Sequence, residues 1–166
     1  MIHPSAEVYS EVIGMNTSIW QFAVVMEGAK IGADCNIGSH VFIENNVSIG
    51  DRVTIKNGAM LFEGLTIADQ CFIGPGVVFT NDLYPRSERV ETKRSVISEI
   101  SIEKGVSIGA NATIRAGILI GEYSLIGAGA MVTKDVPPFS LVLGNPGKIV
   151  GTVDKNGEVV SRLAKE

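Results

Sequence analysis

Apolar residues recur at every sixth position through most of this chain. Starting at Ile13, twelve residues spaced six apart are all apolar, and the last of them is Phe79. The series stops in a polar, proline-containing stretch and resumes at Ile102 for six more residues, ending at Val132. A helix repeats its apolar face every 3.6 residues and a strand every two. A strict period of six therefore indicates a repeated strand-and-turn unit, and we call these 18 apolar residues the anchors.

Two other positions of the hexad are almost as regular. The residue four after each anchor is usually small or β-branched, as at Ala23, Cys35 and Val41, and the residue three after it is Gly, Asn or Asp in 13 of 18 cases. Residues two apart in a strand share a face, and Gly, Asn and Asp tolerate positive φ at a turn. Three such sides close a triangular coil. The pattern predicts an all-β parallel β-helix of about six coils, roughly 30 Å tall at about 4.8 Å per coil.

A β-sandwich is the alternative all-β fold, but its turn signals come every 8–12 residues rather than every six.

The ends of the chain depart from the hexads. Ile2 and Val8 predict an irregular first coil, and Pro137-Pro138 cannot continue a central strand. Residues 155–158 (KNGE) predict a hairpin turn between 149–154 and 159–161. We expect one β-helix domain over 1–166, with a protruding loop at roughly 83–101 and a short irregular C-terminal tail.

Composition narrows the partners and the compartment. The net charge is −4 and the basic residues form no dense patch, which argues against a nucleic-acid backbone as the main partner. We expect neither a signal peptide nor a membrane span, because the start lacks a charged and apolar leader and no long apolar run occurs. The cysteines Cys35 and Cys71 both fall at inward positions two coils apart, too far for a disulfide. We expect inert core thiols in a cytoplasmic protein.

One corner of the predicted prism differs from the other two. Residues 18 apart lie above one another, and the corner after every third anchor stacks Glu27, Asn45, Glu63 and Asn81, whereas the other corners carry most of the repeat glycines. The long break in the hexads leaves from this same corner, at Asp82. A long loop in a compact domain is usually functional or disordered. We interpret the corner as a candidate site, the alternative being a merely solvated edge.

The small number of histidines limits the kinds of catalytic site that the chain can form. A zinc site of the kind found in γ-class carbonic anhydrases needs three histidines, and the chain has only His3 and His40, so we expect no metal. A His–Asp dyad, as in serine acetyltransferases, would need a histidine at the polar corner, but His40 falls at another. Acyl transfer to an amine requires less, because positioning and hydrogen bonds to the oxyanion can suffice.

Several motifs resemble one family of enzymes. They are residues 37–46 (IGSHVFIENN), 54–58 (TIKNG), 72–75 (FIGP), 79–87 (FTNDLYPRS), 108–114 (IGANATI), 127–130 (GAGA), 133–137 (TKDVP) and 144–146 (GNP). Together they resemble the hexapeptide-repeat N-acetyltransferases that modify nucleotide-linked 3-amino sugars with acetyl-CoA. The late motifs occur in many hexapeptide acyltransferases, whereas 79–87 is more specific. Relatives often have Trp-His where this chain has Trp20-Gln21.

The resemblance implies a left-handed β-helix, a homotrimer with sites between subunits, and transfer of acetyl from acetyl-CoA to a dTDP-3-amino-3,6-dideoxyhexose for bacterial glycans such as O-antigen. It assigns Asn81 as the active-site residue, and the sugar nucleotide and CoA contacts to the following positions: Asn45, Glu63, Tyr84 and Arg86 for the sugar nucleotide, and Ala110, Ala128, Lys134, Pro137 and Pro146 for CoA. Relatives suggest substrate-assisted chemistry without a clear general base. Two alternatives stay open: the UDP-2-acetamido-3-amino uronate branch, and a non-catalytic assembly protein.

Overall fold

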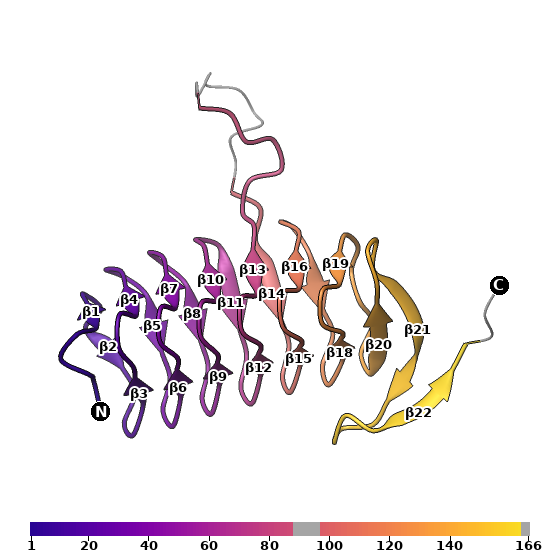
Figure 1. The fold of residues 1–166 in the computed structure, drawn as a ribbon, viewed down its shortest axis with the longest axis horizontal. Coiled ribbons are helices and arrows are strands. Elements are labelled where there is room, and N and C mark those ends of the chain that lie inside the picture. The colour runs from indigo at the N-terminus through magenta and orange to yellow at the C-terminus, as the bar shows by residue number, and fades with distance from the viewer. Residues whose placement is uncertain (88–96, 164–166) are drawn as a thin grey trace.

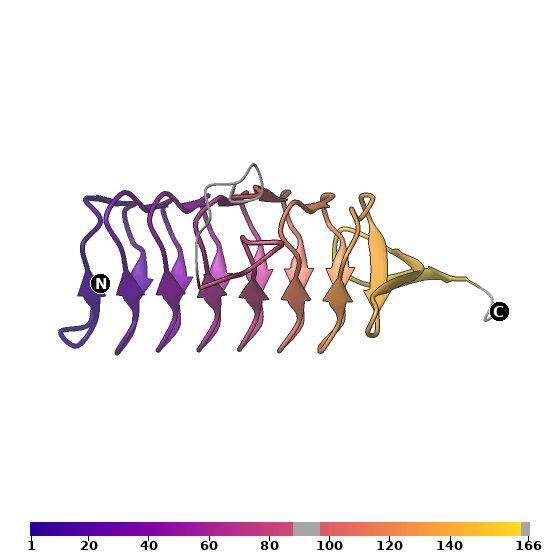
Figure 2. The ribbon, with the colours of Figure 1, turned by 90° about the horizontal axis from the view of Figure 1, so that it is seen from above.

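The computed structural model, which describes residues 1–87 and 97–163, is a three-sided prism of short strands (Figure 1). Most strands contain only two residues, an outward one followed by an inward anchor. Successive strands belong to successive faces, so each face is a parallel sheet whose neighbours come from consecutive coils. Viewed from above, the coils stack evenly along the long axis (Figure 2). The hexads therefore form the parallel β-helix that their period predicts, and it is the left-handed β-helix that the family resemblance implies.

Three sheets make up the faces, and we number them in chain order. Sheet 1 consists of β1 (Glu7–Val8), β4 (Val24–Val25), β7 (Phe42–Ile43), β10 (Met60–Leu61), β13 (Val78–Phe79), β16 (Thr113–Ile114) and β19 (Met131–Val132). Sheet 2 consists of β2 (Val12–Ile13), β5 (Lys30–Ile31), β8 (Ser48–Ile49), β11 (Leu65–Ile67), β14 (Ile100–Ile102) and β17 (Leu119–Ile120). Sheet 3 consists of β3 (Ser18–Ile19), β6 (Asn36–Ile37), β9 (Thr54–Ile55), β12 (Phe72–Ile73), β15 (Ser107–Ile108), β18 (Leu125–Ile126), β20 (Ser140–Leu143), β21 (Lys148–Val153) and β22 (Val159–Arg162).

The anchors form the core. Every anchor from Ile19 onward is at most 3% exposed, and the small residues before them share the same cluster. Register confirms the 18-residue coil, because Ile43 pairs with Leu61 and Leu61 with Phe79. Burial of an aliphatic side chain contributes about 1.5–3 kcal/mol. A column of such side chains through the whole prism explains why the period of six is kept so strictly.

The predicted turn positions adopt the left-handed conformation. Positive φ occurs at every position three residues after an anchor except Asp82 and Asp135. Five of these residues, Phe22, His40, Arg52, Gln70 and Tyr123, are not Gly, Asn or Asp. The coil geometry thus imposes positive φ even on residue types that seldom adopt it. Composition alone identified most of these turns, and the period identifies the rest.

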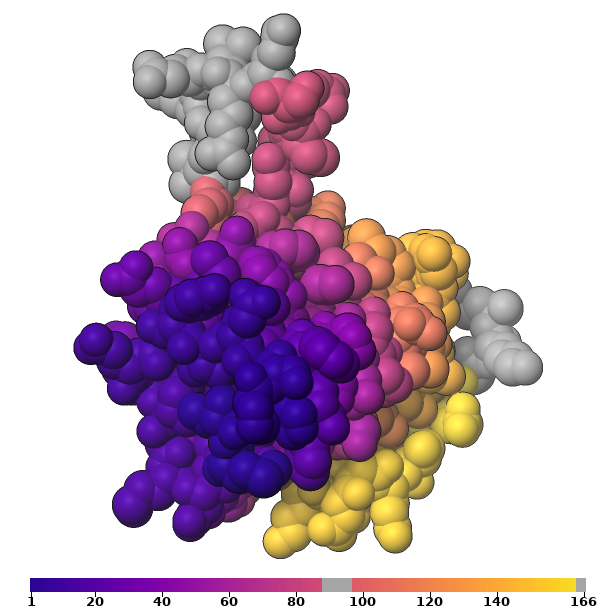
Figure 3. Space-filling view, turned by 60° about the vertical axis from the view of Figure 1, so that its left-hand side comes forward, coloured from indigo at the N-terminus to yellow at the C-terminus, as the bar shows by residue number. Residues whose placement is uncertain are grey.

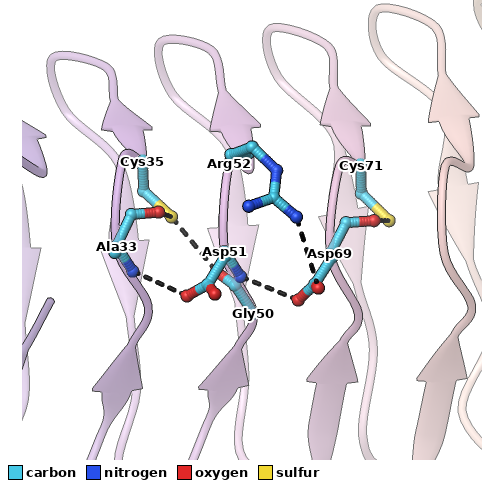
Figure 4. A network of polar contacts seen from close by, with 7 residues as sticks. All are labelled: Ala33, Cys35, Gly50, Asp51, Arg52, Asp69 and Cys71. Atoms are coloured by element: carbon cyan, nitrogen blue, oxygen red, sulfur yellow. Dashed lines mark hydrogen bonds and ion pairs between the residues drawn. The ribbon is translucent and has the colours of Figure 1, made fainter.

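Corner 2–3, between sheets 2 and 3, holds a ladder of backbone caps (Figure 4). Ala33 donates its N–H to Asp51 Oδ1 at 2.8 Å, and Asp51 donates its own N–H to Asp69 Oδ1 at 2.9 Å. The thiol of Cys35 donates to the Gly50 carbonyl at 3.1 Å. Both cysteines are buried and free, as the sequence analysis expected. Acidic side chains at this corner therefore join one coil to the next.

The inserted segment and the C-terminal tail differ from the sequence prediction in detail. The inserted segment between β13 and β14 ends at Glu99, two residues earlier than expected, because Ile100 and Ser101 already pair with Leu65 and Thr66. The tail is not irregular: β20 still stacks on β18 in parallel, and β21 and β22 add the predicted hairpin in antiparallel pairing. Within 1–87 and 97–163 the structure contains no helix that could span a membrane.

Candidate active site

The polar corner lies between sheets 1 and 2, and we call Glu27, Asn45, Glu63 and Asn81 the polar column. Each of the four follows a strand of sheet 1 by two residues, after β4, β7, β10 and β13. Because those strands pair in register, the four residues stack one per coil. The expected vertical alignment of Asn45, Glu63 and Asn81 is therefore present.

Hydrogen bonds tie the upper part of the column together. Asn81 donates Nδ2–H to the carbonyl oxygen of Glu63 at 3.3 Å. The Glu63 carboxylate accepts from Asn46 Nδ2 at 2.8 Å, and its backbone N–H donates to Glu44 Oε2 at 2.8 Å. A carbonyl oxygen can only accept, so the amide group of Asn81 must direct Nδ2 toward it and present Oδ1 elsewhere. Glu63 and Asn81 are thus oriented side chains, not freely rotating ones.

Two residues beside the column hold it in place, and neither was predicted from the sequence to have a role. Asn46 fixes the Glu63 carboxylate, and Glu44 caps the Glu63 backbone. A sequence signal did exist for Asn46, because an Asn three residues after the anchor Ile43 predicts a turn, and the structure has φ 58° there. The carboxylates of Asp51 and Asp69 at corner 2–3 accept backbone N–H groups, whereas that of Glu63 is held by a side chain.

The inserted segment starts directly above this column. Ser98 donates its N–H to the Asn81 carbonyl at 3.2 Å, and Ile100 donates to the Gly64 carbonyl at 2.9 Å, so the base of the segment closes on the column. Residues 82–87 then stand away from the prism (Figures 1 and 3). Tyr84 and Arg86 both lie in this projecting part, and both are exposed. They share the corner of Asn81 but project beyond the surface of their own chain.

Thr80 closes the gap that the insertion leaves in the stack. Its Oγ1 accepts the N–H of Ala116 at 3.1 Å, which ties the coil after the insertion to the coil before it. The strand ladder is also unbroken, since Phe79 pairs with Ile114. The prism therefore continues in register past the inserted segment.

The residues predicted to bind CoA lie on more than one corner. Ala110 and Ala128 stack on corner 3–1, where a Cβ added to Gly109 would meet the backbone of Ala128. Pro146 lies on the same corner beyond β20, Lys134 lies above the polar column two coils past Asn81, and Pro137 lies on corner 2–3. Within a single chain the structure does not bring Ala110 and Ala128 together with Asn81.

His40 lies away from the polar column, as its place in the hexads predicts. His40 lies on corner 3–1, where its ring packs against Phe22 with centroids 5.1 Å apart. Gln21, at the position where relatives often carry His, accepts a hydrogen bond from Ser39 Oγ at 3.2 Å on that corner. Among residues 1–87 and 97–163, no group of three or more His, Cys, Asp or Glu is placed to hold a metal ion.

Comparison with known proteins first indicates the class of protein to which the chain is similar. The model of the bacterial transferase hexapeptide (six repeats) matches residues 99–134, and that of the GMPPB C-terminal domain matches 21–99. A crystal structure of a mutant GDP-perosamine N-acetyltransferase from Caulobacter crescentus, in complex with CoA and GDP-perosamine, is 26% identical with a TM-score of 0.59; the match covers 90% of this chain and 55% of that one. An N-acyltransferase from Bacillus cereus in complex with dTDP and coenzyme A shares the fold, at 19% identity and a TM-score of 0.69, over 93% of this chain and 81% of that one.

The family follows from a closer relative. The chain is 47% identical over 152 residues to the dTDP-3-amino-3,6-dideoxy-α-D-galactopyranose 3-N-acetyltransferase of Aneurinibacillus thermoaerophilus, which covers 92% of this chain and 78% of the relative. The protein belongs to the hexapeptide-repeat sugar N-acetyltransferases, which use acetyl-CoA.

Proposed function

We propose that this protein transfers the acetyl group of acetyl-CoA to the 3-amino group of a dTDP-3-amino-3,6-dideoxyhexose, at sites between the subunits of a homotrimer. The observation that carries the proposal is the hydrogen-bonded stack of Glu63 and Asn81 at the corner from which the inserted segment leaves. The 47% identity to an enzyme of that activity supports the substrate class.

The proposed reaction requires the protein only to position the two substrates and to donate and accept hydrogen bonds. The neutral amine attacks the thioester carbonyl carbon, the new C–N bond forms, the C–S bond breaks, and the amine proton ends on the departing CoA sulfur. Asn81 Oδ1 accepts an N–H of the amine, and Glu63 binds a neighbouring hydroxyl of the sugar. Backbone N–H groups at the coil turns donate to the developing oxyanion, a contribution of several kcal/mol in comparable sites.

The apolar outer face of sheet 1 supports the trimer. The outward residues of its central strands are Val24, Phe42, Met60 and Val78, whereas those of sheet 2 include Lys30, Ser48, Thr66 and Ser101. Met60 is 38% exposed in the single chain. An apolar stripe of this kind on a soluble prism usually marks an interface.

A three-fold arrangement on this face would complete the site. If sheet 1 of each subunit faces an axis parallel to the prism, corner 1–2 of one subunit lies beside corner 3–1 of the next. Asn81 of one chain would then face the groove wall on which Ala110 and Ala128 of its neighbour lie one and two coils higher. A convex corner cannot enclose a substrate by itself, and a groove between two corners can. CoA passing Ala128 and then Ala110 would bring its thioester to Asn81.

The test is acetyl transfer by the purified protein. CoA release would be followed with a thiol reagent against dTDP-3-amino-3,6-dideoxygalactose, its glucose epimer and a UDP-2-acetamido-3-amino uronate, with the product identified by mass. We expect turnover with at least one dTDP sugar, and light scattering at three times the 17.6 kDa chain mass. Exclusive turnover of the UDP sugar would assign the other branch. Absence of acetyl-CoA binding by calorimetry would instead indicate an assembly protein. We place the activity in the cytoplasm, where acetyl-CoA is available.

A further inference from the structure

The side chains on corner 3–1 change character along the prism. The position with positive φ carries Phe22 and His40 in the N-terminal coils, and glycine or asparagine in the later ones: Gly58, Gly76, Asn111 and Gly129. Corner 3–1 therefore carries aromatic rings at the N-terminal end of the prism, whereas in the later coils the same position has a small side chain or none.

The two rings occupy a costly conformation and remain exposed. Phe22 has φ 59° and is 58% exposed, and His40 also has φ 59° and is exposed. The rings contact each other at 5.1 Å with planes tilted by 41°, so together they form a ledge and not a buried plug. The coil geometry imposes this backbone conformation at the turn position, so the distinctive feature of this corner is that the two residues there carry exposed rings.

The coil next to the two rings carries a positively charged residue, Lys56, on the same corner. Lys56 lies on corner 3–1 one coil above His40, is exposed, and has no acidic partner at ion-pair distance among the residues described. In the proposed trimer, Lys56 is level with Glu63 of the adjacent chain, and the ring ledge is level with Asn45 and Glu27. The order along the groove is then ledge, cation and, facing Asn81, the glycines of the Gly74–Gly76 turn.

We infer that this N-terminal half of corner 3–1 binds the nucleotide half of the substrate, with the pyrimidine base on the rings of Phe22 and His40 and the diphosphate beside Lys56. The inference rests on the proposed function and deepens it. Phe22 lies three coils below the level of Asn81, a separation of about 14 Å that an extended sugar diphosphate spans. Aromatic faces and a lysine ammonium are the groups that stack on bases and neutralise phosphate.

Glycine substitutions make a clean test, because glycine adopts φ near 59° without strain and the fold is expected to survive. We expect Phe22→Gly and His40→Gly each to raise the KM of the dTDP sugar, and the Kd of dTDP itself, roughly tenfold, with the KM of acetyl-CoA unchanged. Lys56→Gln should raise the same two constants roughly fivefold. Matched controls are Gln70→Gly, another residue with positive φ, and Lys104→Gln, both at the outer corner 2–3.

The outcomes separate this inference from the proposed function. Unchanged KM and Kd in the ring variants, with normal transfer by the wild type, would overturn the nucleotide subsite alone. Dissociation of the trimer in either glycine variant would show that the rings are a subunit contact, which also overturns it. If the wild type binds dTDP and the ring variants weaken that binding, the subsite stands even if acetyl transfer is not detected.

Discussion

Replacing Asn81 by alanine tests the chemistry most directly. As the amine attacks, its nitrogen becomes positively charged, so the hydrogen bond to Asn81 Oδ1 turns from a neutral into a charge-assisted one. Such a bond contributes about 1.5–3 kcal/mol, against roughly 1 for a neutral pair. The loss of this bond corresponds to a fall in kcat/KM of roughly 10- to 150-fold. Because the bond strengthens in the transition state, the loss should appear in kcat more than in KM.

The same substitution should hardly affect folding. Within the part of the chain that the structure describes, Asn81 makes one side-chain hydrogen bond, to the Glu63 carbonyl; it is long at 3.3 Å and half-buried, so its loss costs about 0.5 kcal/mol. For a chain of this size that lowers Tm by only about 1–2 °C. A nearly normal melting curve together with a strongly reduced kcat would therefore show that the substitution affects the reaction and not the fold.

A matched control lies in the same column. Asn45 has the same side chain two coils below Asn81, is exposed, and should contact the sugar away from the reacting amine. Asn45→Ala should raise the KM of the sugar nucleotide with kcat nearly unchanged. Initial rates of CoA release over both substrates give the split. If Asn81→Ala keeps kcat within twofold of the wild type, or resembles Asn45→Ala, the proposed role of Asn81 is refuted.

Three further changes test the surroundings. Glu63→Gln keeps an acceptor oxygen, so we expect a higher sugar KM with kcat within about threefold in steady-state assays; abolished turnover would mean a general base. Gly64 has φ +90°, and an added Cβ would lie 2.7 Å from Ile97 Cγ2, so Gly64→Ala should cost about 1–3 kcal/mol by calorimetry, more than Gly58→Ala, which has φ +71° and an open Cβ site. Burial raises the pKa of the Cys71 thiol to about 11, so its contribution to stability is present below pH 9 and lost as pH rises toward 11; urea titrations should show a smaller loss in Cys71→Ser.

The sequence was sufficient for the prism because its information is repeated many times. Each anchor must be buried, and a one-residue slip would expose it, so the strict period specifies strand, face and register together. Ile19 and Val132, at opposite ends, obey the same rule. Turn positions were only partly visible from residue type, since Phe22 and Tyr123 do not suggest positive φ.

Features that occur once were harder to predict. The sequence suggested that Pro137-Pro138 ends the pattern, yet β20 stacks on β18 after them. Proline is tolerated there because the pair lies at corner 2–3 between Val136, which bridges to Ile120, and the next strand. The hairpin of β21 and β22 was predicted because its turn follows local rules, and its placement on sheet 3 depends on tertiary pairing.

The polar column shows why the alignment of its residues could be predicted from spacing and their contacts could not. The 18-residue coil alone aligns Asn45, Glu63 and Asn81, whatever their side chains do. Whether a carboxylate at a corner caps backbone, as Asp51 does, or is held by a side chain, as Glu63 is, depends on neighbours in the adjacent coil. The repeat also fixes which corner flanks each side of the apolar sheet 1. The proposed trimer depends on this arrangement, because it places the Asn81 corner of one subunit beside the Ala110 corner of the next.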